Sequence, residues 1–238
     1  MGPWNPAVVV AVLAAVPGAA AAQWEPLLRV PDTASVRRMA RALTLVPHVA
    51  GTPAQAATRD SVLRWMRGWG LETWVKEYVI YLPHPDTIAA WVLGPEGAAP
   101  AALPLDEPPI PGDPATAGPR VPPFNGYSGD GDVTAEVVYV NYGLIEDYDT
   151  LDSLGISVRS KVAVARYGRS FRGIKAREAE RHGAIGLIMY SDPQDDGYFR
   201  GDVYPDGPMR PAGSIQRGSV MNGNGDPATP GWASSAVP

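Results

Sequence analysis

Residues Ser160 to Pro193 read SKVAVARYGRSFRGIKAREAERHGAIGLIMYSDP, and this stretch decides the fold. Two apolar runs, residues 161–167 and 184–190, flank a segment with alanines at helical spacing. This order predicts a strand, a helix over residues 174–182 and then a buried strand. Gly183 ends the helix and permits the tight return to the second strand. A strand–helix–strand unit of this kind is typical of an α/β fold.

The same alternation extends over residues 125–238. Residues 133–140 (VTAEVVYV) predict a strand, and residues 146–154 predict a short helix that Gly155 ends. Beyond Ser191 the chain is rich in glycine, proline and aspartate, so no regular element is predicted there. The regular elements of this part are therefore expected between residues 133 and 190.

Residues 23–94 predict two helices followed by two strands. Thr33 or Ser35 can cap the first helix, and Thr52 caps the second with Pro53 at its first position. The two strands are predicted from alternating or continuous apolar residues at 71–82 and 87–93.

A proline-rich stretch, residues 95–124, separates these two parts. Its composition predicts a linker or a long excursion with polyproline character. One acidic pair, Asp106 and Glu107, interrupts it.

The first 22 residues are predicted to be a secretory signal peptide. An unbroken apolar run from Ala7 to Val16 is followed by the small residues Ala19–Ala22, the pattern of a cleavage site before Gln23. The run is shorter than the ~20 apolar residues that span a bilayer. We therefore expect a secreted or periplasmic protein without a transmembrane anchor. The segment before the run carries no lysine or arginine, which departs from the usual signal pattern.

Composition excludes several classes of function. The chain has 238 residues with a net charge of −5, which argues against general nucleic-acid binding. It contains no cysteine, so disulfides, thiolate metal sites and cysteine nucleophiles are excluded. Glycine and proline, 26 of each, argue for a loop-rich α/β or β-rich fold over a helical bundle.

A series of short motifs identifies a family resemblance. The motifs are Val138–Gly143 (VYVNYG), Ala165–Gly168 (ARYG), Phe171–Gly173 (FRG), Tyr190–Pro193 (YSDP), Tyr204–Gly207 (YPDG), Gln216–Gly218 (QRG), Thr229–Gly231 (TPG) and, upstream, Pro47–Thr52 (PHVAGT). In this order they resemble the protease-associated (PA) domain and the preceding N-terminal part of the glutamate carboxypeptidase II and transferrin receptor branch of zinc peptidases. The resemblance covers nearly all of residues 33–238.

The resemblance implies an α/β fold in two parts. Residues 23–94 would be the N-terminal segment of a zinc exopeptidase domain, and residues 125–238 an inserted PA domain, a β-sandwich-like sheet with flanking helices that is incomplete at its C-terminus. The implied function is that of a secreted carboxypeptidase or aminopeptidase whose PA domain shapes the cleft for a peptide substrate. The family's metal ligands follow the PA domain, so this chain alone is expected to be inactive. A homodimer of the complete protein is compatible with the family.

Two residues are implied to bind substrate. Arg166 of the ARYG motif would bind a peptide carboxylate, and it lies in a basic stretch from Arg159 to Arg181. Its structural alternative is an arginine at a strand end that forms a salt bridge. Ser219 stands where the family has an asparagine after Arg-Gly. A hydroxyl offers one donor where a carboxamide offers two, so a broader dipeptidase or aminopeptidase is as compatible as glutamate specificity.

The resemblance also implies metal ions, namely two zinc ions and a structural calcium in the complete protein. Thr229 and Trp232 match the turn whose backbone carbonyls form half of the calcium site. The three histidines, His48, His84 and His182, lack the spacing of a zinc site and are interpreted as capping or surface groups. No catalytic residue is therefore assigned to this chain. The alternative function is a non-catalytic PA-domain protein that binds a partner.

Overall fold

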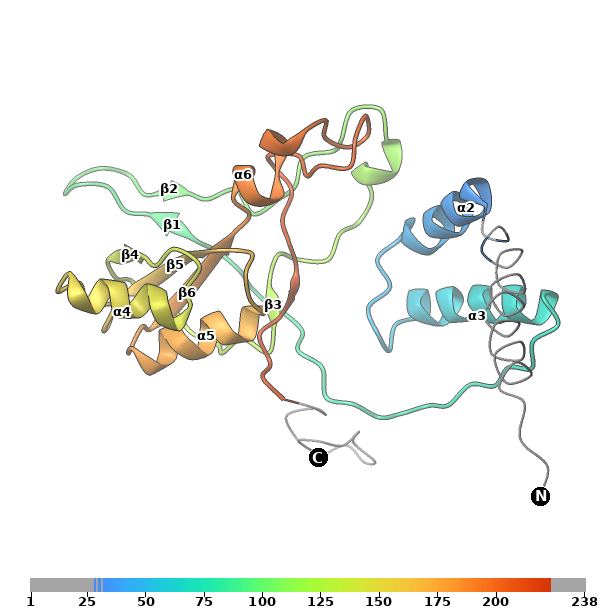
Figure 1. The fold of residues 1–238 in the computed structure, drawn as a ribbon, viewed down its shortest axis with the longest axis horizontal. Helices are drawn as coiled ribbons and strands as arrows, with labels where there is room; N and C mark the ends of the chain where they lie inside the picture. The colour runs from blue at the N-terminus through green and yellow to red at the C-terminus, as the bar shows by residue number, and fades with distance from the viewer. Residues whose placement is uncertain (1–27, 29, 31, 224–238) are drawn as a thin grey trace, which may run out of the picture. The chain divides into compact units, whose positions relative to one another are not determined.

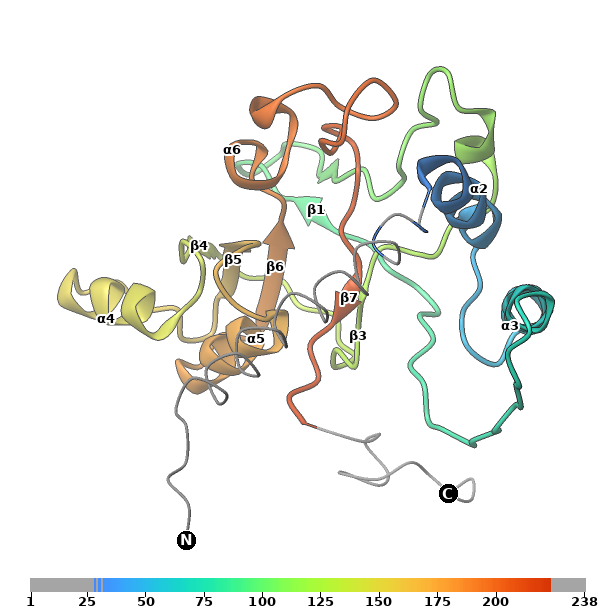
Figure 2. The ribbon, with the colours of Figure 1, turned by 45° about the vertical axis from the view of Figure 1, so that its right-hand side comes forward.

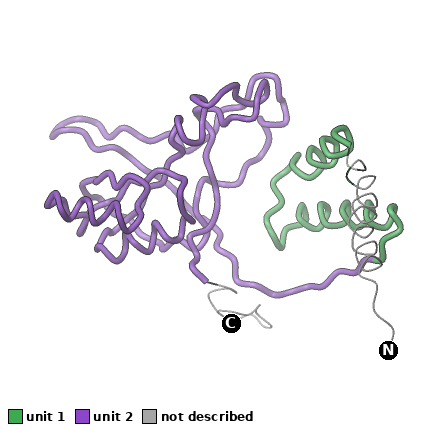
Figure 3. Tube along the Cα trace, in the orientation of Figure 1, with its two compact units in different colours: residues 1–72 green, residues 73–238 purple. Residues whose placement is uncertain are grey.

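The computed structural model of the chain describes residues 28, 30 and 32–223 and divides into two compact units, Met1–Glu72 and Thr73–Pro238 (Figure 3). The predicted signal peptide, residues 1–22, lies outside the described residues, as do Thr229 and Trp232. Among the described residues, none of the helices combines the length and the apolar character that a membrane span requires.

The described residues of the first unit form the helices α2 (Thr33–Thr44) and α3 (Pro53–Gly68). Asp32, and not Thr33 or Ser35, caps α2, because its carboxylate accepts the N–H of Ser35 at 2.8 Å. The cap predicted for α3 is confirmed, since the Thr52 hydroxyl accepts the N–H of Gln55 with proline in the first turn.

The two strands predicted before residue 94 are largely wrong. Residues 71–82 form no strand, and β1 is confined to Trp91–Val92, paired antiparallel with β2 (Ala101–Ala102). Alternation of apolar residues reports which face would be buried, but a strand also needs a neighbour to satisfy its backbone groups. Within the described residues no strand pairs with the segment 71–82, and Trp74 is 78% exposed.

The second unit is built on a parallel three-stranded sheet (Figures 1 and 2). Its strands are β4 (Val137–Tyr139), β5 (Val162–Arg166) and β6 (Gly186–Tyr190), in the order β4-β5-β6. Helices α4 (Ile145–Ser153) and α5 (Arg172–Arg181) connect successive strands and lie on the same side of the sheet in both views. The strands and helices predicted here are confirmed, with shifts of a few residues at their ends.

The core fills the space between the sheet and these two helices. Small residues of β5, Ala163 and Ala165, are fully buried and allow Ala179 of α5 to pack closely. Tyr148 of α4 is the largest apolar side chain in this core and stacks on His182, with ring centroids 4.2 Å apart. The apolar strand face and the alanine face of α5 therefore meet as their spacing predicts.

The remaining elements are short. They are the 3-10 helix η1 (Pro114–Ala117), β3 (Asn125–Gly126), α6 (Pro193–Asp196), the 3-10 helix η2 (Tyr198–Arg200) and β7 (Gly218–Ser219). Strands β3 and β7 pair in parallel. Residues 95–124 are anchored to the second unit, because the Tyr204 hydroxyl donates to the Asp113 carboxylate at 2.5 Å. The described chain is thus a mixed α/β protein.

The buried phenol of Tyr148 makes the free energy of unfolding depend on alkaline pH. Burial, with the negative charges of Glu178 and Asp147, raises the pKa of its phenol to about 12. The unfolded chain releases this proton near pH 10, so the stabilising contribution is complete below pH 10 and is lost between pH 10 and 12. We expect Tyr148→Phe to reduce the fall in stability over that interval, measured by urea unfolding at each pH.

The control for this measurement is Tyr78→Phe, because the Tyr78 side chain is 57% exposed. The Tyr148 hydroxyl has no hydrogen-bond partner among the described residues, so its removal is expected to leave stability at pH 7 unchanged or raised by up to ~1 kcal/mol. An identical alkaline response in wild type and Tyr148→Phe would contradict the assignment.

Candidate functional site

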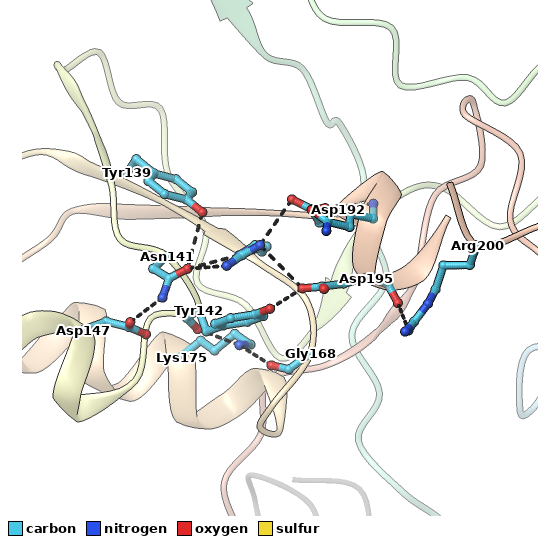
Figure 4. A network of polar contacts seen from close by, with 11 residues as sticks. Tyr139, Asn141, Tyr142, Asp147, Gly168, Lys175, Asp192, Asp195 and Arg200 are labelled. Carbon is cyan, nitrogen blue, oxygen red and sulfur yellow. Dashed lines mark hydrogen bonds and ion pairs between the residues drawn. The ribbon is translucent and has the colours of Figure 1, made fainter. Parts of the chain in front are cut away.

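The carboxyl ends of β4, β5 and β6 meet at one edge of the sheet, the edge at which open α/β sheets bind ligands. Arg166 is the last residue of β5, and it pairs in register with Tyr190 at the end of β6. The loops that follow supply Asn141, Asp192 and Asp195 around it (Figure 4).

The Arg166 guanidinium is held on two sides. Its Nε and Nη2 donate to Oδ1 of Asn141 at 3.1 and 2.7 Å. Its Nη1 lies 3.6 Å from the Asp192 carboxylate and 3.5 Å from that of Asp195. Asn141 is itself oriented by donating to Asp147 at 2.7 Å. Arg166 therefore already has an amide and two carboxylates as partners, which matches its structural alternative.

Tyr142 lies at the centre of this network. Its ring faces the guanidinium of Arg166 at 4.1 Å and that of Arg169 at 4.6 Å, and its hydroxyl donates to Asp195. The hydrogen bond to Asp195, together with burial, raises the pKa of the Tyr142 phenol. The Lys175 ammonium holds the loops after β4 and β5 together, because it donates to the carbonyls of Tyr142 at 2.6 Å and Gly168 at 2.8 Å.

Ser219, the second predicted substrate residue, lies elsewhere. It ends β7, and its hydroxyl accepts the N–H of Met221 at 3.1 Å. Among the described residues no hydrogen bond or ion pair joins Ser219 to Arg166. Ser219 pairs with Gly126 of β3, whereas Arg166 is held by Asn141 after β4 and Asp192 after β6. Their assignment to one substrate site stays a prediction.

Arg172 is the arginine that lies beside Ser219. The Nε of Arg172 would be only 2.0 Å from a Cβ built on Gly218, so its guanidinium lies directly against the backbone of β7. Its Nη2 donates to the carbonyl of Arg217 at 3.5 Å, and its buried Nε has no hydrogen-bond partner among the described residues. The Nε of Arg172 is therefore unpartnered among the described residues, whereas the Nε of Arg166 donates to Asn141.

Two sequence features single out Arg172 as a candidate binding residue. It belongs to the FRG motif and to the basic stretch from Arg159 to Arg181, and β7 supplies the glycine that permits its approach. Which of several arginines in that stretch faces β7 depends on the position of α5, because Arg172 is the first residue of that helix.

The residues present do not fit a zinc centre. Across residues 28, 30 and 32–223, no three histidine, aspartate or glutamate side chains converge to hold a metal ion. His48 contacts the Val46 carbonyl, His84 is exposed near Asp86, and His182 contacts the Glu178 carbonyl at 2.8 Å. The described residues thus assign no chemical step to a metal.

The family model that matches the chain is the PA domain, over residues 133–222. "Probable glutamate carboxypeptidase VP8" of Zea mays is 39% identical over 206 residues, which cover 85% of this chain and 25% of that protein. "Aminopeptidase NAALADL1" of Mus musculus is 33% identical over 209 residues, which cover 84% of this chain and 28% of that protein. The chain spans about a quarter of the length of the curated relatives it matches.

Among solved structures, the aminopeptidase from Aneurinibacillus sp. strain AM-1 aligns with 79% of this chain and 35% of its own length. Its TM-score of 0.35 at 19% identity is too low to establish a common fold. The sequence relatives are much closer and extend well beyond the PA domain on its N-terminal side. The resemblance predicted from the sequence is therefore confirmed: the chain contains a PA domain and is homologous, over most of its length, to the glutamate carboxypeptidase family.

Proposed function

We propose that this chain is part of a secreted zinc-dependent exopeptidase of the carboxypeptidase or aminopeptidase type. Similarity to named peptidases over 85% of the chain is the observation that supports it. In this proposal residues 23–94 belong to the peptidase domain, residues 95–124 form the proline-rich excursion, and residues 125–238 are the PA domain. The zinc ions would be held outside the described residues, and when bound they would activate water. A calcium ion at Thr229 and Trp232 remains a prediction.

The PA domain would form one wall of the substrate cleft and bind a carboxylate of the peptide. Arg172 and Ser219 are the better candidates for this contact, because Arg172 lies against Gly218, the residue before Ser219, and forms no ion pair with a carboxylate among the described residues. A carboxylate approaching Arg166 would meet the two aspartates that already face it, and like charges would repel the ligand. Arg166 would then act as a positioning residue that orders the loops at the sheet edge.

This division of roles is tested by binding. The full chain is titrated with N-acetyl-L-alanine, which carries a carboxylate, and with N-acetyl-L-alaninamide, which does not. We expect Arg172→Gln to weaken binding of the carboxylate about 10- to 100-fold, the range of a lost charge-assisted hydrogen bond, and to leave the amide unchanged. Binding of each ligand is measured from the change in the NMR chemical shift of the Ser219 amide.

The matched variant is Arg166→Gln. We expect it to lower the melting temperature while the folded protein keeps its preference for the carboxylate ligand. Loss of that preference in Arg166→Gln, with Arg172→Gln unaffected, would return the binding role to Arg166. If neither ligand binds the wild-type chain, carboxylate binding by this PA domain is wrong.

A further inference from the structure

One carboxylate of the proline-rich stretch, that of Glu107, bonds to residues just before β7. Glu107 accepts the N–H of Ile215 on Oε1 at 2.6 Å and pairs with Nη2 of Arg217 on Oε2 at 2.8 Å. Only 18% of the Glu107 side chain and 27% of the Arg217 side chain are exposed. Both oxygens of one carboxylate are thus used to hold residues just before β7.

The Arg217 guanidinium also bonds to two backbone carbonyls. Its Nε donates to the carbonyl of Val121 at 2.7 Å, and its Nη1 donates to the carbonyl of Ile215 at 3.0 Å. The guanidinium therefore joins both ends of the stretch from Glu107 to Val121 to the segment 215–217. A planar guanidinium presents its donors in a fixed fork, so the positions of Arg217 and its acceptors are fixed relative to one another.

The anchored segment leads directly into the proposed carboxylate site. The carbonyl of Arg217 accepts Nη2 of Arg172, and the next two residues are Gly218, which contacts Arg172, and Ser219. A shift of residues 215–217 would therefore move Gly218 and Ser219 relative to the Arg172 guanidinium.

We propose that Glu107 is a positioning residue for carboxylate binding: by holding Ile215 and Arg217, it sets the distance between β7 and Arg172. This inference rests on the proposed function of Arg172 and Ser219. The role requires an ionised side chain with two acceptor oxygens. A glutamine keeps one acceptor and turns an NH₂ group toward one of the two donors.

The charge state at Glu107 agrees with this role. Burial raises the pKa of its carboxyl, but hydrogen bonds from Arg217 and Ile215, with the charges of Arg217 and Arg120, outweigh burial and lower the pKa overall. The carboxylate is thus ionised at neutral pH and is available to both donors.

The test compares Glu107→Gln with Asp106→Asn, which removes an adjacent exposed carboxylate, and with Glu107→Asp, which retains the charge. N-acetyl-L-alanine is titrated into each full-length variant, and stoichiometry is fitted separately so that unfolded protein does not alter the Kd. We expect Glu107→Gln to raise the Kd about 3- to 30-fold, Glu107→Asp to recover part of this loss, and Asp106→Asn to change nothing. Hydrogen exchange of the Ile215 amide is measured in parallel.

The two proposals fail in different ways. If Arg172→Gln abolishes carboxylate binding and Glu107→Gln only lowers the folded fraction at an unchanged Kd, the positioning role is wrong and the carboxylate site stands. If wild-type protein does not bind N-acetyl-L-alanine, the carboxylate site is wrong, and the positioning role is overturned with it even when exchange at Ile215 accelerates in Glu107→Gln.

Discussion

Replacing Lys175 by alanine is expected to lower the free energy of unfolding of the unit Thr73–Pro238 by about 4 kcal/mol, from two lost hydrogen bonds and a cavity. Lys175 is fully buried, and its ammonium donates to the carbonyls of Tyr142 and Gly168 at 2.6 and 2.8 Å. Truncation would leave the carbonyl of Tyr142 without this donor, and the carbonyl of Gly168 would keep only its hydrogen bond from the N–H of Ser170. Urea unfolding followed by circular dichroism measures the loss.

Lys175→Met separates the two causes of this loss, because methionine fills most of the same volume without donating. About 2 to 3 kcal/mol is expected for this variant, the cost of losing two hydrogen bonds from a buried charged donor. The control is Lys161→Ala, since Lys161 pairs with Glu136 at the surface and such pairs contribute little. Equal effects at Lys161 and Lys175 would contradict the role assigned to the buried ammonium.

The buried ammonium also has a pH signature with a sign opposite to that of Tyr148. Burial lowers the pKa of Lys175 from its usual 10.5, with a smaller opposing effect of Asp147. Between the lowered value and 10.5 the unfolded chain binds more protons than the folded chain, so this group makes stability rise with pH in that interval. Lys175→Met should lack the rise.

The sequence predicted the region from β5 to β6 because each signal there agrees with its surroundings. The apolar runs form neighbouring strands, Ala179 of α5 shares the core with Ala163 and Ala165, and Gly183 adopts the positive φ of +82° that a return after a helix requires. Segment 71–82 had the alternation of a strand but lacks a pairing partner among the described residues. Pairing is a long-range property that a local pattern does not contain.

The candidate site shows the same limit. The ARYG motif predicted Arg166 correctly as the end of a strand, and its partners Asp192 and Asp195 lie after β6, the strand beside β5 in the sheet order β4-β5-β6. Whether an arginine is neutralised or has a free donor depends on such distant residues. The basic stretch therefore predicts an anion site without indicating which arginine would provide it.

Gly173→Ala tests the contact between α5 and the β7 segment. A Cβ at Gly173 would lie 2.5 Å from the carbonyl oxygen of Val220 and 2.8 Å from Nδ2 of Asn222, which donates to the Gly173 carbonyl. A side chain such as that of Asn222 can rotate away, but the backbone of Val220 must shift, and Val220 is itself bonded to Gly126 through its N–H. We expect a loss of about 3 kcal/mol, the upper part of the range for overpacking.

The matched control is Gly68→Ala, another glycine within a helix. A Cβ at Gly68 meets nothing within 4 Å, so this substitution should stabilise α3 by up to ~1 kcal/mol through helix propensity alone. If the free energy of unfolding falls for Gly173→Ala and rises for Gly68→Ala, the loss at Gly173 comes from its contact and not from the removal of glycine. Because Gly173 adjoins Arg172, the same variant should also weaken binding of N-acetyl-L-alanine. A variant that keeps wild-type stability would show that β7 and α5 are not in the close contact on which the carboxylate site depends.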